Sequence, residues 1–126
     1  MQLIFDTNIF IYHLNNQLSE SGENLLRMGL MGQGAYSVIS RIEVLGFQQS
    51  NLEEARAKQL LSRLVELPLT LEIAERTIQL RKHFKIKVPD AIIAATALEY
   101  SLQLITRNTA DFSNIEALRL ANPFEN

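Results

Sequence analysis

The sequence predicts an α/β fold with three layers, α/β/α, in which a mostly parallel sheet of four to five strands lies between two layers of helices. Two observations lead to this prediction. Short apolar segments alternate along the chain with longer segments whose apolar residues recur at helical spacing, a pattern typical of successive βαβ units. The chain has 126 residues, 47% of them hydrophobic, which is enough to form one domain over residues 1–126.

The first half of the chain is expected to start with a buried strand, because a short apolar run ends at Asp6. Gly32 and Gly34 end the second predicted helix and form a turn before the next strand. Ser40 and Glu43 have the spacing of a capping box, which predicts a helix that begins at Ser40. In chain order we expect a strand over 2–5, helices over 7–14 and 19–31, a strand over 35–39, and helices over 40–48 and 51–64.

The second half is expected to alternate in the same way. Thr70 is a typical N-cap residue ahead of a segment with helical periodicity. Pro89 and Asp90 are typical of a helix start, and the helix that follows is apolar on nearly all sides. Such a helix is either buried on more than one side or part of an interface. In chain order we expect an extended segment over 66–69, a helix over 70–84, a loop over 85–88, a helix over 90–100, a strand over 102–106, a polar turn over 107–111 and a last strand over 117–121.

Most acidic residues lie on predicted helix surfaces among basic residues, but four stand at the ends of predicted elements. Three of them directly follow strands, and the other is at the start of the apolar helix. The carboxyl ends of parallel strands share one edge of a doubly covered sheet, where ligands bind, so we expect these carboxylates to meet there. The four residues are Asp6, Glu43, Asp90 and Asp111.

Each of these acidic residues also has a structural alternative, as a turn residue or a helix cap. The sequence leaves these alternatives open, because Asp and capping-box Glu are common at helix starts. The alternatives are a turn at Asp6 with Asn8, a capping box of Ser40 with Glu43, an N-cap at Asp90, and a cap at Asp111 for a short segment over 112–116.

A cluster of four carboxylates would be strongly repulsive unless a cation lay among them. Oxygen ligands suit Mg²⁺ or Mn²⁺, and a sequence with no Cys and only two His lacks the side chains of common zinc and iron–sulfur sites. These metals serve phosphoryl chemistry, so the acids predict metal-activated attack of water on a phosphodiester.

The net charge of −2 is unusual for a protein that binds nucleic acid, but the positive charges are unevenly spread. Residues 81–87 hold four Lys and Arg side chains, which form either a solvated helix end or a phosphate-binding cluster. Together with Arg41 and Arg107, this cluster is a candidate to guide a phosphate backbone. The absence of Cys favours a reducing compartment, here the cytoplasm, and neither a secretory leader nor membrane association is expected.

Segments of the sequence resemble the successive motifs of the PIN domain family, and in particular of the VapC toxins of bacterial toxin–antitoxin pairs. They occur in the family's order, as Ile4–Tyr12, Ser37–Gly46, Asp90–Ala97 and Leu104–Phe112. The resemblance implies a PIN-like fold and a metal-dependent endoribonuclease whose catalytic and metal-binding residues are Asp6, Glu43, Asp90 and Asp111. It also implies small polar residues beside the site, and with two arginines these form the expected substrate-binding set: Thr7, Asn8, Arg41, Thr106, Arg107 and Asn108.

The resemblance further implies two protein partners. One is a cognate antitoxin, whose C-terminal segment enters the active-site groove, and the other is a second copy of the chain in a homodimer. The apolar helices expected over 51–64 and 90–100 independently favour the homodimer. Two alternatives stay open: a PIN-type RNA-processing nuclease without an antitoxin, and a non-catalytic interaction module on the same fold.

Overall fold

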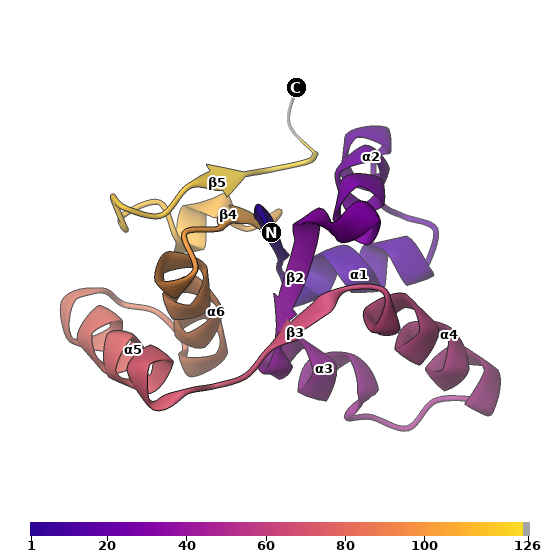
Figure 1. Ribbon diagram of the computed structural model, residues 1–126, viewed down its shortest axis with the longest axis horizontal. Coiled ribbons are helices and arrows are strands. Elements are labelled where there is room, and N and C mark those ends of the chain that lie inside the picture. Colours follow the sequence, from indigo (N-terminus) through magenta and orange to yellow (C-terminus); the bar gives the residue numbers. More distant parts are fainter. Residues whose placement is uncertain (125–126) are drawn as a thin grey trace.

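The computed structural model describes residues 1–124; residues 125 and 126, at the end of the domain expected over 1–126, lie outside the described residues. The central sheet has five strands in the order β3-β2-β1-β4-β5, and every neighbouring pair is parallel (Figure 1). The expected α/β/α fold with a mostly parallel sheet is therefore confirmed. The strands are β1 (Leu3–Phe5), β2 (Gly34–Ser37), β3 (Val65–Leu67), β4 (Gln103–Ile105) and β5 (Leu120–Ala121).

Helices cover both faces of this sheet: Figure 1 shows α5 and α6 on one side and α1 to α4 on the other. Within residues 1–124, no helix combines the length and the apolar character that crossing a membrane requires. The helices are α1 (Thr7–Leu14), α2 (Glu20–Met28), α3 (Val38–Leu45), α4 (Asn51–Ser62), α5 (Leu71–His83) and α6 (Val88–Glu99), with short helical turns η1 (Gly29–Gln33) and η2 (Thr109–Asp111).

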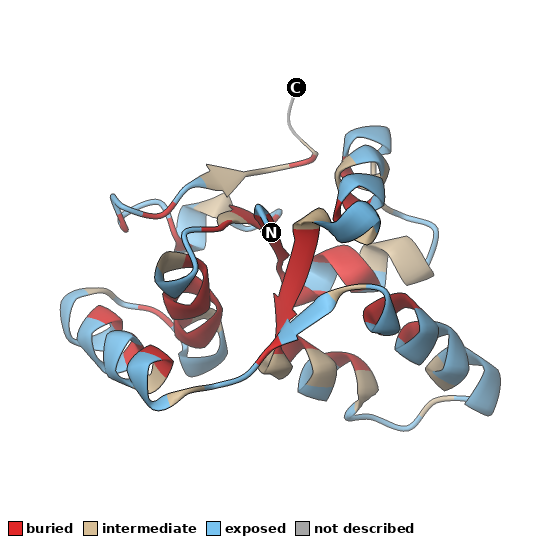
Figure 2. Cartoon of the chain, viewed as in Figure 1, coloured by how far each residue is buried: buried red, intermediate tan, exposed pale blue. Residues whose placement is uncertain are grey.

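The strands contribute alternate residues to two hydrophobic cores, because successive side chains of a strand point to opposite faces of a sheet. Ile4 of β1 belongs to the core on the α5 and α6 side, whereas its neighbours Leu3 and Phe5 belong to the core on the α1 to α4 side. Figure 2 shows that β2 and most of α6 are buried, while the outer surfaces of α4 and α5 are exposed. The sheet is thus covered on both faces, which leaves its carboxyl edge as the place for a site.

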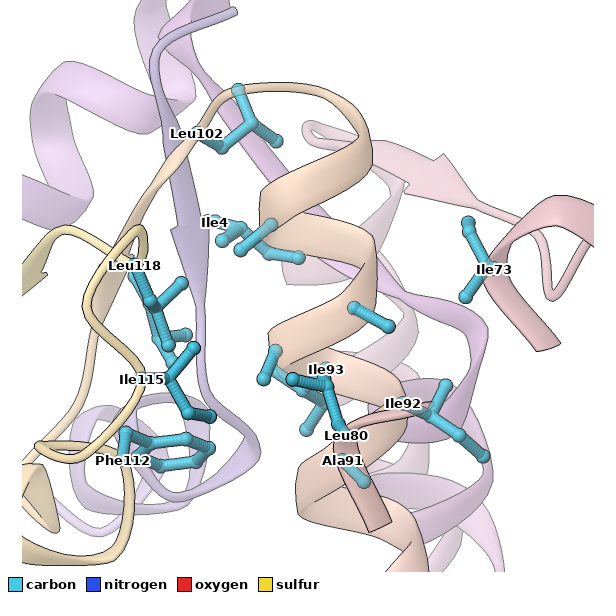
Figure 3. Packing of buried hydrophobic residues seen from close by; sticks show 14 of the residues in the cluster. Ile4, Ile73, Leu80, Ala91, Ile92, Ile93, Leu102, Phe112, Ile115 and Leu118 are labelled. Carbon is cyan, nitrogen blue, oxygen red and sulfur yellow. The ribbon is translucent and has the colours of Figure 1, made fainter. Parts of the chain in front are cut away.

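Helix α6 is buried as its apolar sequence predicts, since every residue from Ala91 to Ala97 is buried. Figure 3 shows this helix between Ile4 of β1 and Ile73 of α5, so its own chain covers it on two sides. The apolar surface of α6 therefore no longer argues for a homodimer. Apolar side chains that do remain exposed include Leu52 of α4 and Leu71 of α5.

The junction of β2 and α3 differs from the expected one. The strand ends at Ser37, and the next two residues, which were expected in the strand, already belong to α3. Ser37 caps this helix, because its Oγ accepts a hydrogen bond from the Ile39 N–H at 3.1 Å. The prediction that Ser40 begins the helix in a capping box with Glu43 was therefore wrong. Ser37 is the N-cap residue, and Ser40 is buried within the first turns of the helix.

Two of the proposed helix caps are also wrong. Helix α6 begins at Val88 with Lys87 at its N-cap position, so Asp90 lies inside the first turn and does not cap the helix. Asp111 lies at the end of η2, and the segment over 112–116 forms turns with no helix for it to cap. The structural alternatives for these two acidic residues therefore fail, whereas Asp6 does cap α1 by accepting from the Thr7 N–H.

The turn between α2 and β2 requires glycine at two positions, as the sequence suggests. Gly32 has a φ of +98°, in the left-handed region that side chains other than glycine rarely adopt. A Cβ on Gly34 would lie only 2.6 Å from the Gly29 Cα, so the backbones at these two points approach closely. This turn returns the chain to the sheet, and β2 can then deliver α3 to the carboxyl edge.

Candidate active site

Asp6 is fixed at the carboxyl edge of the sheet between β1 and its neighbour β4. The residue is only 5% exposed. Its Oδ1 accepts from the Thr7 N–H at 2.8 Å, and its Oδ2 accepts from the Thr106 Oγ1 hydroxyl at 2.8 Å. Because Thr106 directly follows β4, the parallel pairing of the two strands positions the donor next to the acid. Both oxygens of Asp6 are therefore held by groups that the fold itself brings together.

Glu43 is attached to the same part of the site through a chain of hydroxyl groups. Thr7 Oγ1 donates to Glu43 Oε1 at 2.6 Å and also lies 2.8 Å from Ser40 Oγ. A hydroxyl has one proton to donate, so Ser40 must be the donor to Thr7. Ser40 is fully buried, and we did not predict it as a site residue. Its position one helical turn before Glu43, on the same face of α3, is the sequence signal that points to it.

Asp90 and Asp111 occupy the other part of the edge and have a different environment. Both line an open pocket of about 390 Å³, together with three cationic side chains and one aliphatic residue. Within residues 1–124, neither carboxylate forms an ion pair or accepts a side-chain hydrogen bond. The residues that complete the pocket lining are Arg81, Lys85, Ile86 and Lys87.

The four carboxylates affect one another electrostatically. Burial is the largest cause that raises the pKa of Asp6 above its ordinary value; the hydrogen bonds from Thr106 and Thr7 oppose it, and the charges of Glu43 and Asp111 add to it. Burial also raises the pKa of Asp90, and the nearby carboxylates of Asp6, Asp111 and Glu43 raise it further, while Lys87 opposes them. The expectation that all four acids gather at one edge therefore agrees with the structure.

The chemistry of this group of oxygen ligands fits a hard divalent cation such as Mg²⁺ or Mn²⁺. Within the described residues, no group of three or more His, Cys, Asp or Glu side chains is arranged so that it could hold a metal ion. Burial is the main cause of the raised pKa values of Asp6 and Asp90, but the neighbouring carboxylates raise both further, and a bound cation would relieve that repulsion. Asp6, Glu43, Asp90 and Asp111 are the side chains that would hold it.

The small polar residues expected near the site fall into two groups. Thr7 and Thr106 are buried and hold the carboxylates, so their hydroxyls are positioning groups. Asn8, in the first turn of α1, and Asn108 are exposed. The Asn108 backbone N–H donates to Thr106 Oγ1 at 3.0 Å, which fixes the oxygen that in turn donates to Asp6. The two asparagine side chains are free to meet a ligand from solvent.

The two arginines expected to contact substrate are both engaged elsewhere. Arg41 pairs through Nε with Glu66 of β3, on the far side of β2 from Asp6. Arg107 donates to the Tyr12 hydroxyl at 3.0 Å, and its guanidinium carbon lies 4.3 Å from the centre of the Phe124 ring. Arg107 thus fastens the C-terminal segment of the described chain to α1. The structure does not bring either guanidinium into contact with the four acids.

Comparison with known proteins places these observations in a family. The family model described as PIN domain matches residues 3–118. The curated proteins include no match to the chain. Among solved structures, a chain of a toxin–antitoxin complex from Klebsiella pneumoniae is 35% identical, with a TM-score of 0.81, and the alignment covers 99% of this chain and 100% of that chain.

Two further structures extend the comparison. VapBC2 from Rickettsia felis, solved with a DNA fragment from its promoter, contains a chain that is 25% identical, with a TM-score of 0.82 and coverage of 97% of this chain and 98% of that chain. FitAcB from Neisseria gonorrhoeae contains a chain that is 22% identical, with a TM-score of 0.84 and coverage of 99% and 100%. The last of these comparisons shows a shared fold alone.

Proposed function

The chain belongs to the PIN domain family and is VapC-like, and from this premise we propose that it is a metal-dependent endoribonuclease, the toxin of a toxin–antitoxin pair. The observation that carries the proposal is the convergence of Asp6, Glu43, Asp90 and Asp111 on one edge of the sheet. Two of these acids have no capping role, and they line a pocket that also holds cations. Carboxylates next to cations suit a metal ion and a phosphodiester together.

The residues of the chain divide the work of catalysis between them. Asp6, Glu43 and Asp90 would hold one cation, and Asp111 would help to place a second cation or orient a water molecule. Bound Mg²⁺ or Mn²⁺ would lower the pKa of a water molecule and stabilise the charge that develops on the phosphate. Thr7 and Thr106 keep Glu43 and Asp6 in fixed orientations, since each hydroxyl donates to a carboxylate oxygen.

Two protein partners belong to the proposal. The similarity to chains of toxin–antitoxin complexes over nearly the whole length supports a cognate antitoxin that inhibits the enzyme. We also expect a homodimer, to which exposed apolar side chains such as Leu52 and Leu71 would contribute. A mass near 14.3 kDa by light scattering at micromolar concentration would contradict the homodimer.

The direct test is RNA cleavage with and without the metal. Purified protein is incubated with total bacterial RNA in MgCl₂, in MnCl₂ and in EDTA, and the new ends are mapped by sequencing. We expect cleavage at defined positions with either metal and none in EDTA. Glu43→Gln should abolish the cleavage, whereas Glu72→Gln, the same change on the exposed surface of α5, should not. Cleavage that continues unchanged in EDTA, or in Glu43→Gln, would contradict the proposal.

A further inference from the structure

The pocket beside Asp90 and Asp111 combines opposite charges in an unusual way. It has a volume of about 390 Å³ and is open to solvent. Its charged lining consists of two carboxylates and three cations, and the cations come from the end of α5 and the loop that leads into α6. They are Arg81, Lys85 and Lys87, three of the four positive residues in the segment 81–87.

These cations are not used in ion pairs with the rest of the protein. Within residues 1–124, the ion pairs of Lys and Arg are those of Arg41, Lys58 and Arg76, so Lys85 and Lys87 are unpaired. Both lysines are exposed. Unpaired lysines beside a group of carboxylates suggest that the missing partner is an external anion.

Arg81 gives the pocket a fixed shape. Its Nε donates to the Ile86 carbonyl oxygen at 3.2 Å, which ties the loop before α6 back to the end of α5. Within residues 1–124, the two terminal nitrogens of this guanidinium have no other partner, so they are available to a ligand. Arg41 and Arg107 differ in this respect, because Glu66 and the Tyr12–Phe124 pair occupy their guanidinium groups.

The net charge of the pocket depends on whether a cation is bound to its two carboxylates. Asp90 and Asp111 now balance two of the three positive charges. When a cation compensates these carboxylates, the three positive side chains of the lining are left without a counter-charge. The pocket then attracts anions at the moment when the acidic site is ready for a phosphodiester.

We propose that this pocket binds a backbone phosphate of the RNA next to the scissile phosphodiester, through Lys85, Lys87 and Arg81. This inference rests on the ribonuclease function proposed above and assigns a substrate-binding subsite to it. The proposal also gives the basic residues of the segment 81–87 different roles. Lys82 and His83 lie on the solvated end of α5, outside the pocket lining, whereas the three cations of the lining contact the substrate.

The test compares two lysines that differ in position but not in charge. Lys85→Ala removes a cation of the pocket, and Lys82→Ala removes an exposed cation three residues away that does not line it. Binding of a fluorescein-labelled, single-stranded 20-nucleotide RNA is measured by anisotropy in CaCl₂, so that a divalent cation can compensate the carboxylates, and in EDTA, each over a series of salt concentrations. Cleavage of the same RNA in MgCl₂ gives kcat and KM for each protein.

For Lys85→Ala we expect weaker binding and a KM about 5–10-fold higher, with kcat changed less than about twofold, because one phosphate contact is lost. The slope of log K against log salt should become shallower by about 0.7, the value for one charge on a single strand. Lys82→Ala should change the RNA affinity and KM by less than about twofold. Arg81→Lys, which keeps the charge but loses the Nε donor to Ile86, should also raise KM.

Equal effects of Lys85→Ala and Lys82→Ala, or no effect of either, would overturn the phosphate pocket while the ribonuclease function stands. Weaker binding of a co-expressed antitoxin by Lys85→Ala, with RNA binding unchanged, would also overturn it and would assign the pocket to the protein partner. Wild-type protein that neither binds nor cleaves RNA would overturn the proposed function itself, and the phosphate pocket with it.

Discussion

The two halves of the acidic edge are built differently. Asp6 and Glu43 lie in a network of buried hydroxyls, in which Ser40 donates to Thr7, Thr7 to Glu43, and Thr106 to Asp6. Asp90 and Asp111 face an open pocket, and within residues 1–124 no side chain donates to them. Both oxygens of Asp6 and one oxygen of Glu43 therefore have donors within the described chain, whereas Asp90 and Asp111 have no side-chain donor there.

This difference has a physical cause in the fold. Asp6 and Thr106 follow adjacent strands, so the Asp6 carboxylate is buried, whereas Glu43 is exposed and is held through Thr7 where α3 packs against α1. A carboxylate buried there needs donors for its oxygens, and the hydroxyls supply them. Asp111 is exposed on a short turn, where solvent can serve instead, and Asp90 is half-buried at the start of α6, facing the pocket. In the proposed site, the first half therefore presents ligands that are already oriented, and Asp90 and Asp111 complete it next to the cations of the pocket.

Among the changes that compare the two halves, the largest effect should come from Asp6→Asn, which removes a proposed metal ligand from the half that holds Asp6 and Glu43. We expect RNA cleavage to fall by at least about 100-fold, since the charge that holds the metal is lost. Asn caps a helix about as well as Asp, so α1 should remain intact. The melting temperature in EDTA should stay level or rise, because a buried carboxylate is removed. A loss of cleavage caused by unfolding would be visible in the same melting curves.

Asp111→Asn is the matched change in the open half, and it should reduce cleavage by only about 10-fold. Asp111 has no hydrogen-bond donor among the side chains of residues 1–124, so its replacement disturbs nothing else. The ratio of the two losses, measured as kcat/KM on one RNA, expresses the difference between the halves. Equal losses would show that the halves do not divide the work.

Removing a hydroxyl from the network should affect both stability and activity. Thr7→Val keeps the shape of the side chain but leaves Ser40 without an acceptor and Glu43 without a donor. We expect unfolding free energy to fall by about 1–3 kcal/mol and cleavage to fall by about 10–100-fold. Denaturant unfolding and cleavage rates measure the two effects. A Thr7→Val protein of full stability and full activity would show that the network is dispensable.

The dependence of stability on pH offers a smaller effect. The pKa of Asp6 is raised in the folded protein, so this group favours folding below its unfolded pKa, and that contribution is lost as pH rises through the folded pKa. Asp6→Asn removes the dependence. In EDTA, the melting temperature of Asp6→Asn relative to wild type should therefore rise with pH from about 4 upward. A difference that stays constant over this range would contradict the assigned direction.

The smallest effect on catalysis should come from Arg107→Ala. This change removes the hydrogen bond to Tyr12 and the contact with Phe124, so the end of the described chain should loosen from α1. Hydrogen exchange near Phe124 should rise, whereas KM for RNA should change by less than about twofold. A loss of RNA affinity as large as that expected for Lys85→Ala would place Arg107 in substrate binding, as its position in the sequence suggests.

The fold, and with it the placement of the four acids near one edge of the sheet, could be predicted because local and topological rules agree there. Strands alternate with helices, and in a parallel sheet the residues that follow the strands, such as Asp6 and Asp111, come to one edge. This holds even when the exact ends of the helices between them are misjudged. The start of α3 was misplaced because its β-branched first residues resemble the end of a strand, while Ser37 and Ser40 are both plausible caps. Because the helix begins after Ser37, the Ser40 side chain points into the protein. Its hydrogen bond with Thr7 depends on tertiary packing, which the sequence does not reveal.

The roles of the cations were the least predictable part. Arg41 and Arg107 lie next to motif residues in the sequence, yet Glu66 and Phe124 engage them from distant parts of the chain. The cluster over 81–87 was ambiguous because a helix end and a phosphate site favour the same residues. The bond from Arg81 to Ile86 places Arg81 in the lining of the pocket, and it depends on a loop geometry that no sequence rule supplies.

The shift in melting temperature that MgCl₂ produces, compared between wild type and Asp90→Asn, tests the metal site most directly. Asp90 does not cap α6, so the substitution should leave metal-free stability level or slightly higher. Wild-type protein should melt at a higher temperature in saturating Mg²⁺ than in EDTA, because a ligand that binds only the folded state stabilises it. Asp90→Asn should lose most of this gain, together with RNA cleavage. An active Asp90→Asn protein with an unchanged metal shift would contradict the assignment of these carboxylates as a metal site.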